Sequence, residues 1–423
     1  MVRSAHPGRN SRILLQRTTN TDNAYNSWGG STLYSGPDGP ATRGSFDRPD
    51  AGFAVNRNFL STIPKRLCHT LDGRVVSYEL RSVFRDQGGI VLSPHTFIQV
   101  AQLGRFWYIN QPGSTCEARL EGGQIRLYDG FTYRQSSWRN WEQSFVAWSE
   151  RAGYRFDYAV NSDLEFHPEL LEHYRLVLSV GHDEYWSSPR RDHLEAFIDR
   201  GGNVAFFSGN NAMWQVRSED NGRALVCWKD HKQDPLYLNG DHKQLSTLWC
   251  HHLIDRPENR LTGVSFAYGG YYAFFDKYHD GDGAYEIHRP DHWVFEGTHL
   301  KRGDRLGARD RVIGYECDGC DFEMQGGLPL STGRDGTPET FEILATSPAE
   351  LSVADDSLDL VSKALYGERS TRVQRQPGAA VMGIYTRGGT VFTTGCTEWA
   401  NGLRGRDRAV ERITRNILDR LSQ

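Results

Sequence analysis

No stretch of this 423-residue chain stays apolar over the roughly 18–20 residues that a membrane-spanning helix needs. The amino-terminal segment from Met1 to Asn10 is polar and lacks the apolar core of a secretion signal. The seven cysteines are odd in number and scattered, which does not suit the disulfide framework of a secreted protein. We therefore expect a cytoplasmic protein with reduced thiols and no membrane partner.

An excess of charge of either sign is also missing. The chain carries 49 Lys and Arg residues against 53 Asp and Glu residues, which gives a formal net charge of −4. Such a balance offers no electrostatic attraction to nucleic acid, so we expect no nucleic-acid partner. The Gly-x-Ser-x-Gly elbow of serine hydrolases and the Gly-x-x-x-x-Gly-Lys-Ser/Thr phosphate loop are absent too, so neither class has support.

Aromatic residues, in contrast, are plentiful, with 11 Trp, 19 Tyr and 20 Phe. Many of them lie in irregular, glycine-rich stretches such as residues 266–275. Large aromatic side chains line ligand pockets as well as filling cores. The composition therefore favours a pocket with aromatic walls, although plain packing is the more common role of any single ring.

Residues 176–187 are the most informative segment. A short apolar run, typical of a buried strand, ends in a glycine that is followed by His182, Asp183, Glu184 and Tyr185. Ligands of an open α/β sheet bind just beyond the carboxyl ends of its strands. This segment therefore predicts a functional site, unless its polar residues only cap the next helix and pair with arginines.

Strand-like and helix-like patterns alternate along much of the chain. Strands are expected near residues 12–16, 154–160, 176–180 and 203–207, with helices between them, and such alternation indicates a parallel sheet with right-handed crossovers. We expect an α/β fold with a mainly parallel sheet flanked by helices and long loop or β insertions. The predicted organisation is a single catalytic domain over residues 11–423, with an inserted subdomain at 66–135 and a loop-rich insertion at 215–375.

Five polar side chains lie just past predicted strands: Tyr25, His182, Glu184, Asn210 and Glu316. Phenolate and carboxylate oxygens suit a hard, highly charged cation, so Tyr25 and Glu184 are candidate metal ligands. His182 could orient a ligand or donate a hydrogen bond to a bound substrate. Taken singly, each of these residues is more often a hydrogen-bonded structural group.

Two further constellations have less support. Cys317 and Cys320 form a lone Cys-x-x-Cys pair, which would need two more ligands, such as Cys250 and His252, to bind zinc. Cys396 follows a predicted strand and could act as a nucleophile, but no base partner is evident.

Five segments together resemble the catalytic part of the large subunit of N,N-dimethylformamidase and its relatives. The resemblance implies a class I glutamine-amidotransferase-like, flavodoxin-like fold. It also implies a mononuclear non-haem ferric site that is held by two tyrosines and one glutamate and hydrolyses a small amide. The matching segments are residues 20–34, 45–49, 176–187, 201–217 and 313–318.

Carried over by motif, the resemblance makes Glu184 the glutamate ligand and Tyr25 the first tyrosine ligand. His182 and Asn210 match polar groups that line the family's site, and Glu316 matches the carboxylate proposed as general base.

One position departs from the pattern, because Asp50 stands where the family has its second tyrosine ligand. A site with one phenolate and two carboxylates, Tyr25, Glu184 and Asp50, should prefer ferric iron less strongly and admit Fe2+, Mn2+ or Zn2+. Alternatively, Tyr34 or Tyr185 supplies the second phenolate, or the site has lost its metal.

The function that these patterns and the resemblance favour is a metal-dependent hydrolase, an amidohydrolase that cleaves the C–N bond of a small amide or formamide. Its expected substrate is a small molecule, and a homo-oligomer or a small partner subunit remains open. The alternatives are a metal-free binding or scaffold protein on the same fold, which Asp50 favours, and a different C–N or oxidative reaction at the same metal.

Overall fold

The computed structural model divides into two compact units, one formed by residues 1–21 and 137–423 and the other by residues 22–136. We call them the first and the second unit. The structure describes residues 4–26, 32–34, 40–47, 138–274, 277–278, 283–351, 356–375 and 377–423, and the backbone of six strands between Arg66 and Asp129.

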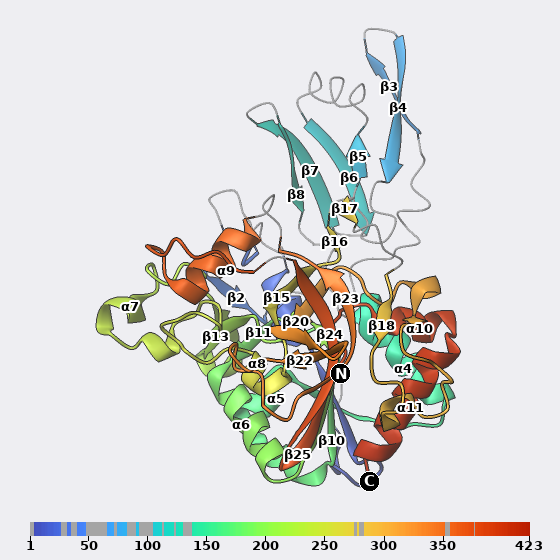
Figure 1. Ribbon diagram of the computed structural model, residues 1–423. Coiled ribbons are helices and arrows are strands. Elements are labelled where there is room, and N and C mark those ends of the chain that lie inside the picture. The colour runs from blue at the N-terminus through green and yellow to red at the C-terminus, as the bar shows by residue number, and fades with distance from the viewer. Residues whose placement is uncertain are drawn as a thin grey trace. The chain divides into compact units, whose positions relative to one another are not determined.

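A nine-stranded sheet forms the centre of the first unit (Figure 1). In spatial order the strands are β19 (Arg305–Leu306), β18 (Tyr285–Ile287), β23 (Glu342–Ala349), β24 (Gly378–Arg387), β25 (Gly389–Thr393), β12 (Asn203–Gly209), β10 (Leu176–His182), β1 (Ile13–Arg17) and β9 (Asp157–Val160). Neighbouring strands from β9 to β25 run parallel, whereas the pairs from β25 through β24, β23 and β18 to β19 are antiparallel.

The expectation of a mainly parallel, flavodoxin-like or glutamine-amidotransferase-like fold is wrong, because this sheet is mixed. A tight turn at Gly388, with φ +69°, joins β24 to β25. A turn of this length can connect only antiparallel neighbours, since parallel strands need a crossover of a dozen or more residues. The antiparallel pairing then extends through β23 to β18 and β19.

The parallel strands are apolar because helices cover both of their faces. Alternate residues of each strand enter different clusters, as Leu14 and Leu15 of β1 do. Leu15 packs with residues of the helices α4 (Gln143–Arg151), α10 (Trp399–Gly405) and α11 (Arg408–Leu421). Leu14 packs with residues of α5 (Asn161–Phe166) and α6 (Ser188–Asp199). The two groups of helices lie on opposite sides of β10 and β25 (Figure 1). A strand buried on both faces reads as a continuous apolar run rather than as an alternating one.

The longest helix, α11 (Arg408–Leu421), begins at Asp407, whose carboxylate accepts hydrogen bonds from the amides of Ala409 and Val410. This contact caps the helix amino terminus, where backbone N–H groups have no partner within the helix. The other α-helices among the described residues are α1 (Thr19–Ala24), α4 (Gln143–Arg151), α5 (Asn161–Phe166), α6 (Ser188–Asp199), α7 (Pro235–Asn239), α8 (Asn259–Thr262), α9 (Ser357–Tyr366) and α10 (Trp399–Gly405), with a π-helical turn at Trp138–Glu142.

Shorter strands lie outside the large sheet. In the first unit they are β11 (Tyr185–Ser187), β13 (Trp214–Glu219), β14 (Ala224–Val226), β15 (Ser265–Tyr271), β16 (Ala273–Phe274), β17 (Lys277–Tyr278), β20 (Glu316–Gly319), β21 (Phe322–Gln325) and β22 (Leu328–Ser331). In the second unit they are β2 (Arg43–Ser45), β3 (Arg66–Leu71), β4 (Arg74–Ser82), β5 (Ile90–Leu92), β6 (Arg105–Gln111), β7 (Ser114–Glu121) and β8 (Gln124–Asp129).

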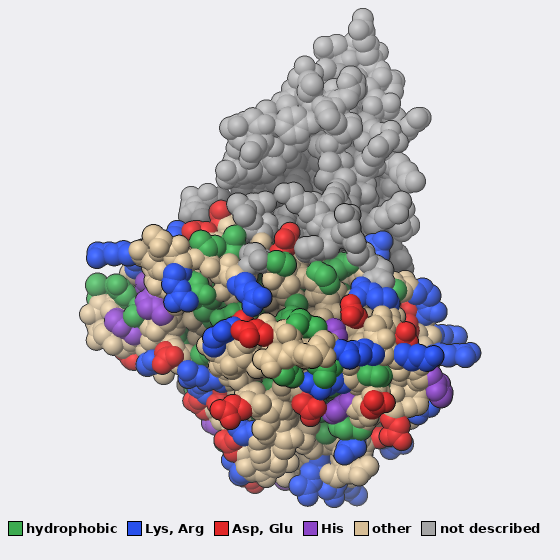
Figure 2. Space-filling view, in the orientation of Figure 1, with side chains coloured by type: hydrophobic (Ala, Val, Ile, Leu, Met, Phe, Trp, Pro, Cys, Tyr) green, Lys and Arg blue, Asp and Glu red, His purple; other side chains and the backbone are tan. Residues whose placement is uncertain are grey.

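One face of the described residues carries side chains of both charges. On the face shown in Figure 2, Lys and Arg side chains lie interspersed with Asp and Glu side chains. Within the described part of the chain, no helix combines the length and apolarity that crossing a bilayer requires.

Candidate active site

The site begins at the carboxyl end of β10. Gly181 has a φ of +85°, and a Cβ at this position would lie only 2.5 Å from the Cβ of Trp141, so glycine is required for both reasons. The strand ends at His182, and the residues from His182 to Trp186 are fully buried. The amide of Glu184 donates to the Oγ1 of Thr21 on α1, 2.9 Å away, which ties this turn to the segment after β1.

An imidazole between two carboxylates forms the centre of the site, and we call His182, Glu184 and Glu316 the acid–histidine cluster. His182 Nε2 lies 2.8 Å from Glu316 Oε2 and 3.3 Å from Glu184 Oε2. Glu316 begins β20, so the cluster joins two segments that are more than a hundred residues apart in the chain. Tyr315 and Trp141 present their rings edge-on to the imidazole, with centroids 6.1 Å and 5.8 Å from it.

Glu184 is held by a tryptophan on its other oxygen. Trp214 opens β13, and its indole Nε1 donates to Glu184 Oε1 at 2.8 Å. Parallel pairing of β11 with β13 places Tyr185 beside Trp214. One oxygen of Glu184 is thus fixed by a neutral donor, and the other faces the imidazole.

The charges of the cluster are coupled. Burial lowers the pKa of His182, but the carboxylates of Glu316 and Glu184 outweigh this effect and raise it to about 10. Burial raises the pKa of Glu316, and the nearby His182 partly offsets this. The arrangement therefore favours an imidazolium at neutral pH, with a carboxylate that readily takes up a proton.

This charge state predicts a pH-dependent stability. The pKa of His182 is higher in the folded protein than the ordinary value of 6.5 for histidine, so its contribution to stability is complete below about pH 6.5 and is lost as the pH rises toward 10. We expect the free energy of unfolding to fall by a few kcal/mol over this window, since one pKa unit corresponds to about 1.4 kcal/mol. Denaturant unfolding at several pH values, compared with His182→Gln, measures the effect. Parallel pH curves for the two proteins would contradict it.

Asn210 completes the site from a third segment. It follows β12, has a left-handed backbone with a φ of +50°, and is fully buried. Its Nδ2 lies 3.4 Å from His182 Nε2, and its side chain also hydrogen-bonds Glu316. The three sequence-predicted residues His182, Asn210 and Glu316 thus meet Glu184 at one point.

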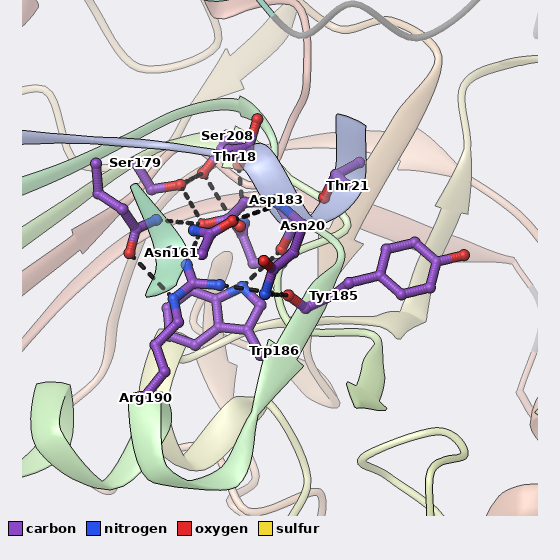
Figure 3. Close-up of polar contacts among 12 residues, drawn as sticks. Thr18, Asn20, Thr21, Asn161, Ser179, Asp183, Tyr185, Trp186, Arg190 and Ser208 are labelled. Atoms are coloured by element: carbon purple, nitrogen blue, oxygen red, sulfur yellow. Dashed lines mark hydrogen bonds and ion pairs between the residues drawn. The ribbon is translucent and has the colours of Figure 1, made fainter. Parts of the chain in front are cut away.

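Asp183 belongs to a separate polar network that includes Ser179 and Arg190 (Figure 3). Its Oδ2 accepts hydrogen bonds from Gln16 Nε2 at 2.8 Å, Ser179 Oγ at 2.9 Å and Arg190 Nη2 at 2.8 Å. The guanidinium of Arg190 also stacks on the Trp186 ring, 3.5 Å from its centroid. Asp183 therefore anchors the turn that carries its neighbours.

Sequence reasoning missed Lys229, which lies in the loop after β14. Its Nζ is buried and lies 4.4 Å from the ring centroid of Trp214 and 5.5 Å from that of Tyr185. Burial lowers the pKa of Lys229 to about 7, against the opposing charge of Glu184. No motif marks a single lysine in a loop, so only the fold reveals this group.

Two predicted ligands do not belong to the first unit. Tyr25 belongs to the second unit, where it is half-buried and stacks on Tyr34 with 4.9 Å between ring centroids. Asp50 falls outside the described residues. Among the residues that the structure does describe, no group of three or more His, Cys, Asp or Glu side chains is arranged to hold a metal ion. The ligand set of Tyr25, Glu184 and Asp50 therefore stays a prediction.

Neither of the cysteine sites considered from the sequence, the zinc site and the Cys396 nucleophile, gains support. Cys250, Cys317, Cys320 and Cys396 are buried free thiols. Burial raises the pKa of Cys396 to about 12, and its Sγ lies 3.0 Å from the carbonyl oxygen of Val312. A buried thiol that resists ionisation is a poor nucleophile and a poor zinc ligand.

Comparison with known proteins agrees with the resemblance seen in the sequence. Residues 1–412 match the model of the family described as N,N-dimethylformamidase beta subunit-like, C-terminal. The N,N-dimethylformamidase beta subunit of Paracoccus aminophilus is 24% identical over 301 residues, which cover 64% of this chain and 35% of that protein. The chain therefore spans about a third of the length of this relative. The match is to the beta subunit, and the assignment to a large subunit stays a prediction. Because the family model covers nearly the whole chain, the protein belongs to the N,N-dimethylformamidase beta subunit-like family.

Proposed function

We propose that the protein hydrolyses the C–N bond of a small amide, with a formamide as the preferred class. The observation that carries the proposal is the acid–histidine cluster at the end of β10, where His182 Nε2 lies between Glu316 Oε2 and Glu184 Oε2 and beside the Asn210 amide. Buried acids and bases with shifted pKa values are typical of catalytic sites. Family membership supports the same reaction, because the relative is named as a formamidase subunit.

In this scheme Glu316 is the general base. It takes a proton from the attacking water as the water oxygen bonds to the amide carbon, and it returns that proton to the nitrogen as the C–N bond breaks. The products are a carboxylic acid and an amine. Asn210 and the His182 imidazolium donate hydrogen bonds to the oxygen that becomes negative, each worth about 2–4 kcal/mol when well placed.

We further propose a mononuclear iron ion, held by Tyr25, Glu184 and Asp50, with Fe2+, Mn2+ or Zn2+ as alternatives to Fe3+. When bound, such a metal supplies a Lewis acid that polarises the carbonyl and lowers the pKa of a water molecule. Glu184 suits this role because carboxylates are hard ligands and the Trp214 N–H on Oε1 fixes its orientation. The His182 imidazolium, 3.3 Å from Oε2, competes for the second oxygen of Glu184.

A partner subunit is also proposed, because the relative is itself named as a beta subunit. A cytoplasmic location remains a prediction from the scattered cysteines. The size of the assembly can be measured directly by light scattering on the purified chain.

Replacing Glu184 by alanine tests the metal proposal. We expect the purified Glu184→Ala protein to lose both its metal, by elemental analysis, and its turnover of N,N-dimethylformamide. A phenolate-to-ferric absorption band in the wild type would identify iron with a tyrosine ligand. A fully active Glu184→Ala enzyme would contradict the metal proposal. A wild type that binds small amides without metal and without turnover would instead support the binding-protein alternative.

A further inference from the structure

A buried carboxylate next to the cluster has no part in the scheme above. Asp318 lies on β20, two residues after Glu316, and is fully buried. Its Oδ1 accepts from the amide of Asn210 at 2.9 Å, and its Oδ2 accepts from the amide of Asn211 at 3.0 Å and from Asn211 Nδ2 at 2.8 Å. One side chain of β20 therefore holds the backbone of the turn that follows β12.

The backbone of this turn adopts an energetically unfavourable conformation. Asn210 and Ala212 have φ values of +50° and +55°. The left-handed region costs a non-glycine residue about 1–2 kcal/mol, so outside contacts must hold the turn in place. The turn also lies directly on β20, since a Cβ on Gly209 would come within 2.8 Å of the carbonyl oxygen of Glu316.

We propose that Asp318 is the positioning residue of the site: its carboxylate clamps the Asn210–Asn211 backbone to β20, so that the Asn210 amide meets both Glu316 and His182. This inference rests on the proposed function for its catalytic consequence and on the hydrogen bonds alone for its structural one. Because Glu316 and Asp318 share one short strand, the clamp fixes the distance between the base and the amide that assists it.

The charge of the clamp matters, because ionised Asp318 only accepts hydrogen bonds and all three neighbouring groups are donors. Burial raises the pKa of Asp318 to about 7, while the Asn211 and Asn210 donors oppose this and Glu316 adds to it. The other titratable groups around it are Glu258, Tyr285 and Cys317. Protonation would place an O–H against N–H donors, so the clamp should weaken as the pH falls below about 7.

The test compares Asp318→Asn with a matched control, Asp335→Asn. Asp335 is also a buried aspartate that accepts two backbone amides, from Asp321 and Thr337, and one asparagine amide, from Asn259. Both variants should lose similar thermal stability. Only Asp318→Asn should lower kcat, by about 10-fold to 100-fold with KM little changed, because small misplacements of reacting groups cost up to that much. Only this variant should also lose the acid limb of the pH profile near pH 7.

A crystal structure of Asp318→Asn separates this inference from the proposed function. We expect the Asn210 side chain to leave Glu316 and His182 while β20 stays in place. That displacement would support the clamp even if the wild type hydrolysed no amide. An Asn210 side chain that stays in place would contradict the proposed role of Asp318, even if the wild type is an active amidase. An equal loss of kcat in the Asp318 and Asp335 variants would also contradict it.

Discussion

Glu316→Gln is expected to lower kcat by about 10²–10⁴-fold, the usual contribution of a general acid–base group. Glutamine keeps the size of the side chain and can still hydrogen-bond Asn210, but it cannot accept a proton from water. Since Glu316 Oε2 lies 2.8 Å from His182 Nε2, the variant also removes the negative charge that most strongly raises the pKa of the imidazole. Metal content should not change, because Glu316 is not among the proposed ligands.

A matched control uses a buried glutamate outside the cluster. Glu165 is buried and accepts one hydrogen bond, from Ser218 Oγ at 2.7 Å, which a glutamine can also accept. Glu165→Gln should keep the wild-type kcat. If Glu316→Gln retained more than a tenth of the wild-type kcat, Glu316 would not be the base.

Asp183→Ala is expected to destabilise the fold by about 3–5 kcal/mol, the typical cost of removing one partner of a buried ion pair. The change leaves the fully buried guanidinium of Arg190 without its carboxylate and removes the acceptor of Gln16 and Ser179 (Figure 3). Denaturant unfolding measures the loss. The double variant Asp183→Leu with Arg190→Met should be less destabilised than Asp183→Ala, because no unpaired charge remains buried.

The surface pair of Asp192 and Arg256 provides the comparison. These groups are 2.6 Å apart, but the Asp192 side chain is 54% exposed. Exposed pairs contribute about 0–1 kcal/mol, so Asp192→Ala should change the free energy of unfolding by no more than that. Equal losses in the Asp183 and Asp192 variants would mean that the network in Figure 3 does not anchor the turn.

The end of β10 was predictable because its signal is local. A mostly apolar run of five residues, followed by a glycine and four polar or aromatic residues, indicates a strand that stops at a site, and His182, Asn210 and Glu316 do meet there. The rule that strand ends converge at one edge of a sheet accounts for His182 and Asn210, at the ends of the neighbouring strands β10 and β12. It does not account for Glu316, which begins β20 outside the large sheet. Their catalytic roles remain predictions.

The direction of the strands was not predictable in the same way. Apolar runs look alike in parallel and antiparallel strands that are buried on both faces, as β10 and β24 are. The prediction of a mainly parallel sheet is therefore wrong at β24, β23 and β18, where the pairing is antiparallel. Lys229 and Asp318 could not be identified as site residues from the sequence. Their pKa values are shifted by burial and by neighbours that are distant in the chain, which sequence spacing does not show.

Hydrolysis in isotopically labelled water tests the central claim most directly. The purified chain is incubated with N,N-dimethylformamide in H₂¹⁸O, and formate and dimethylamine are quantified by mass spectrometry. The account predicts equal amounts of both products with one ¹⁸O atom in the formate from wild-type protein, and almost none from Glu316→Gln. Product formation that is equal in the two proteins, or a wild type with no turnover of any small amide, would contradict it.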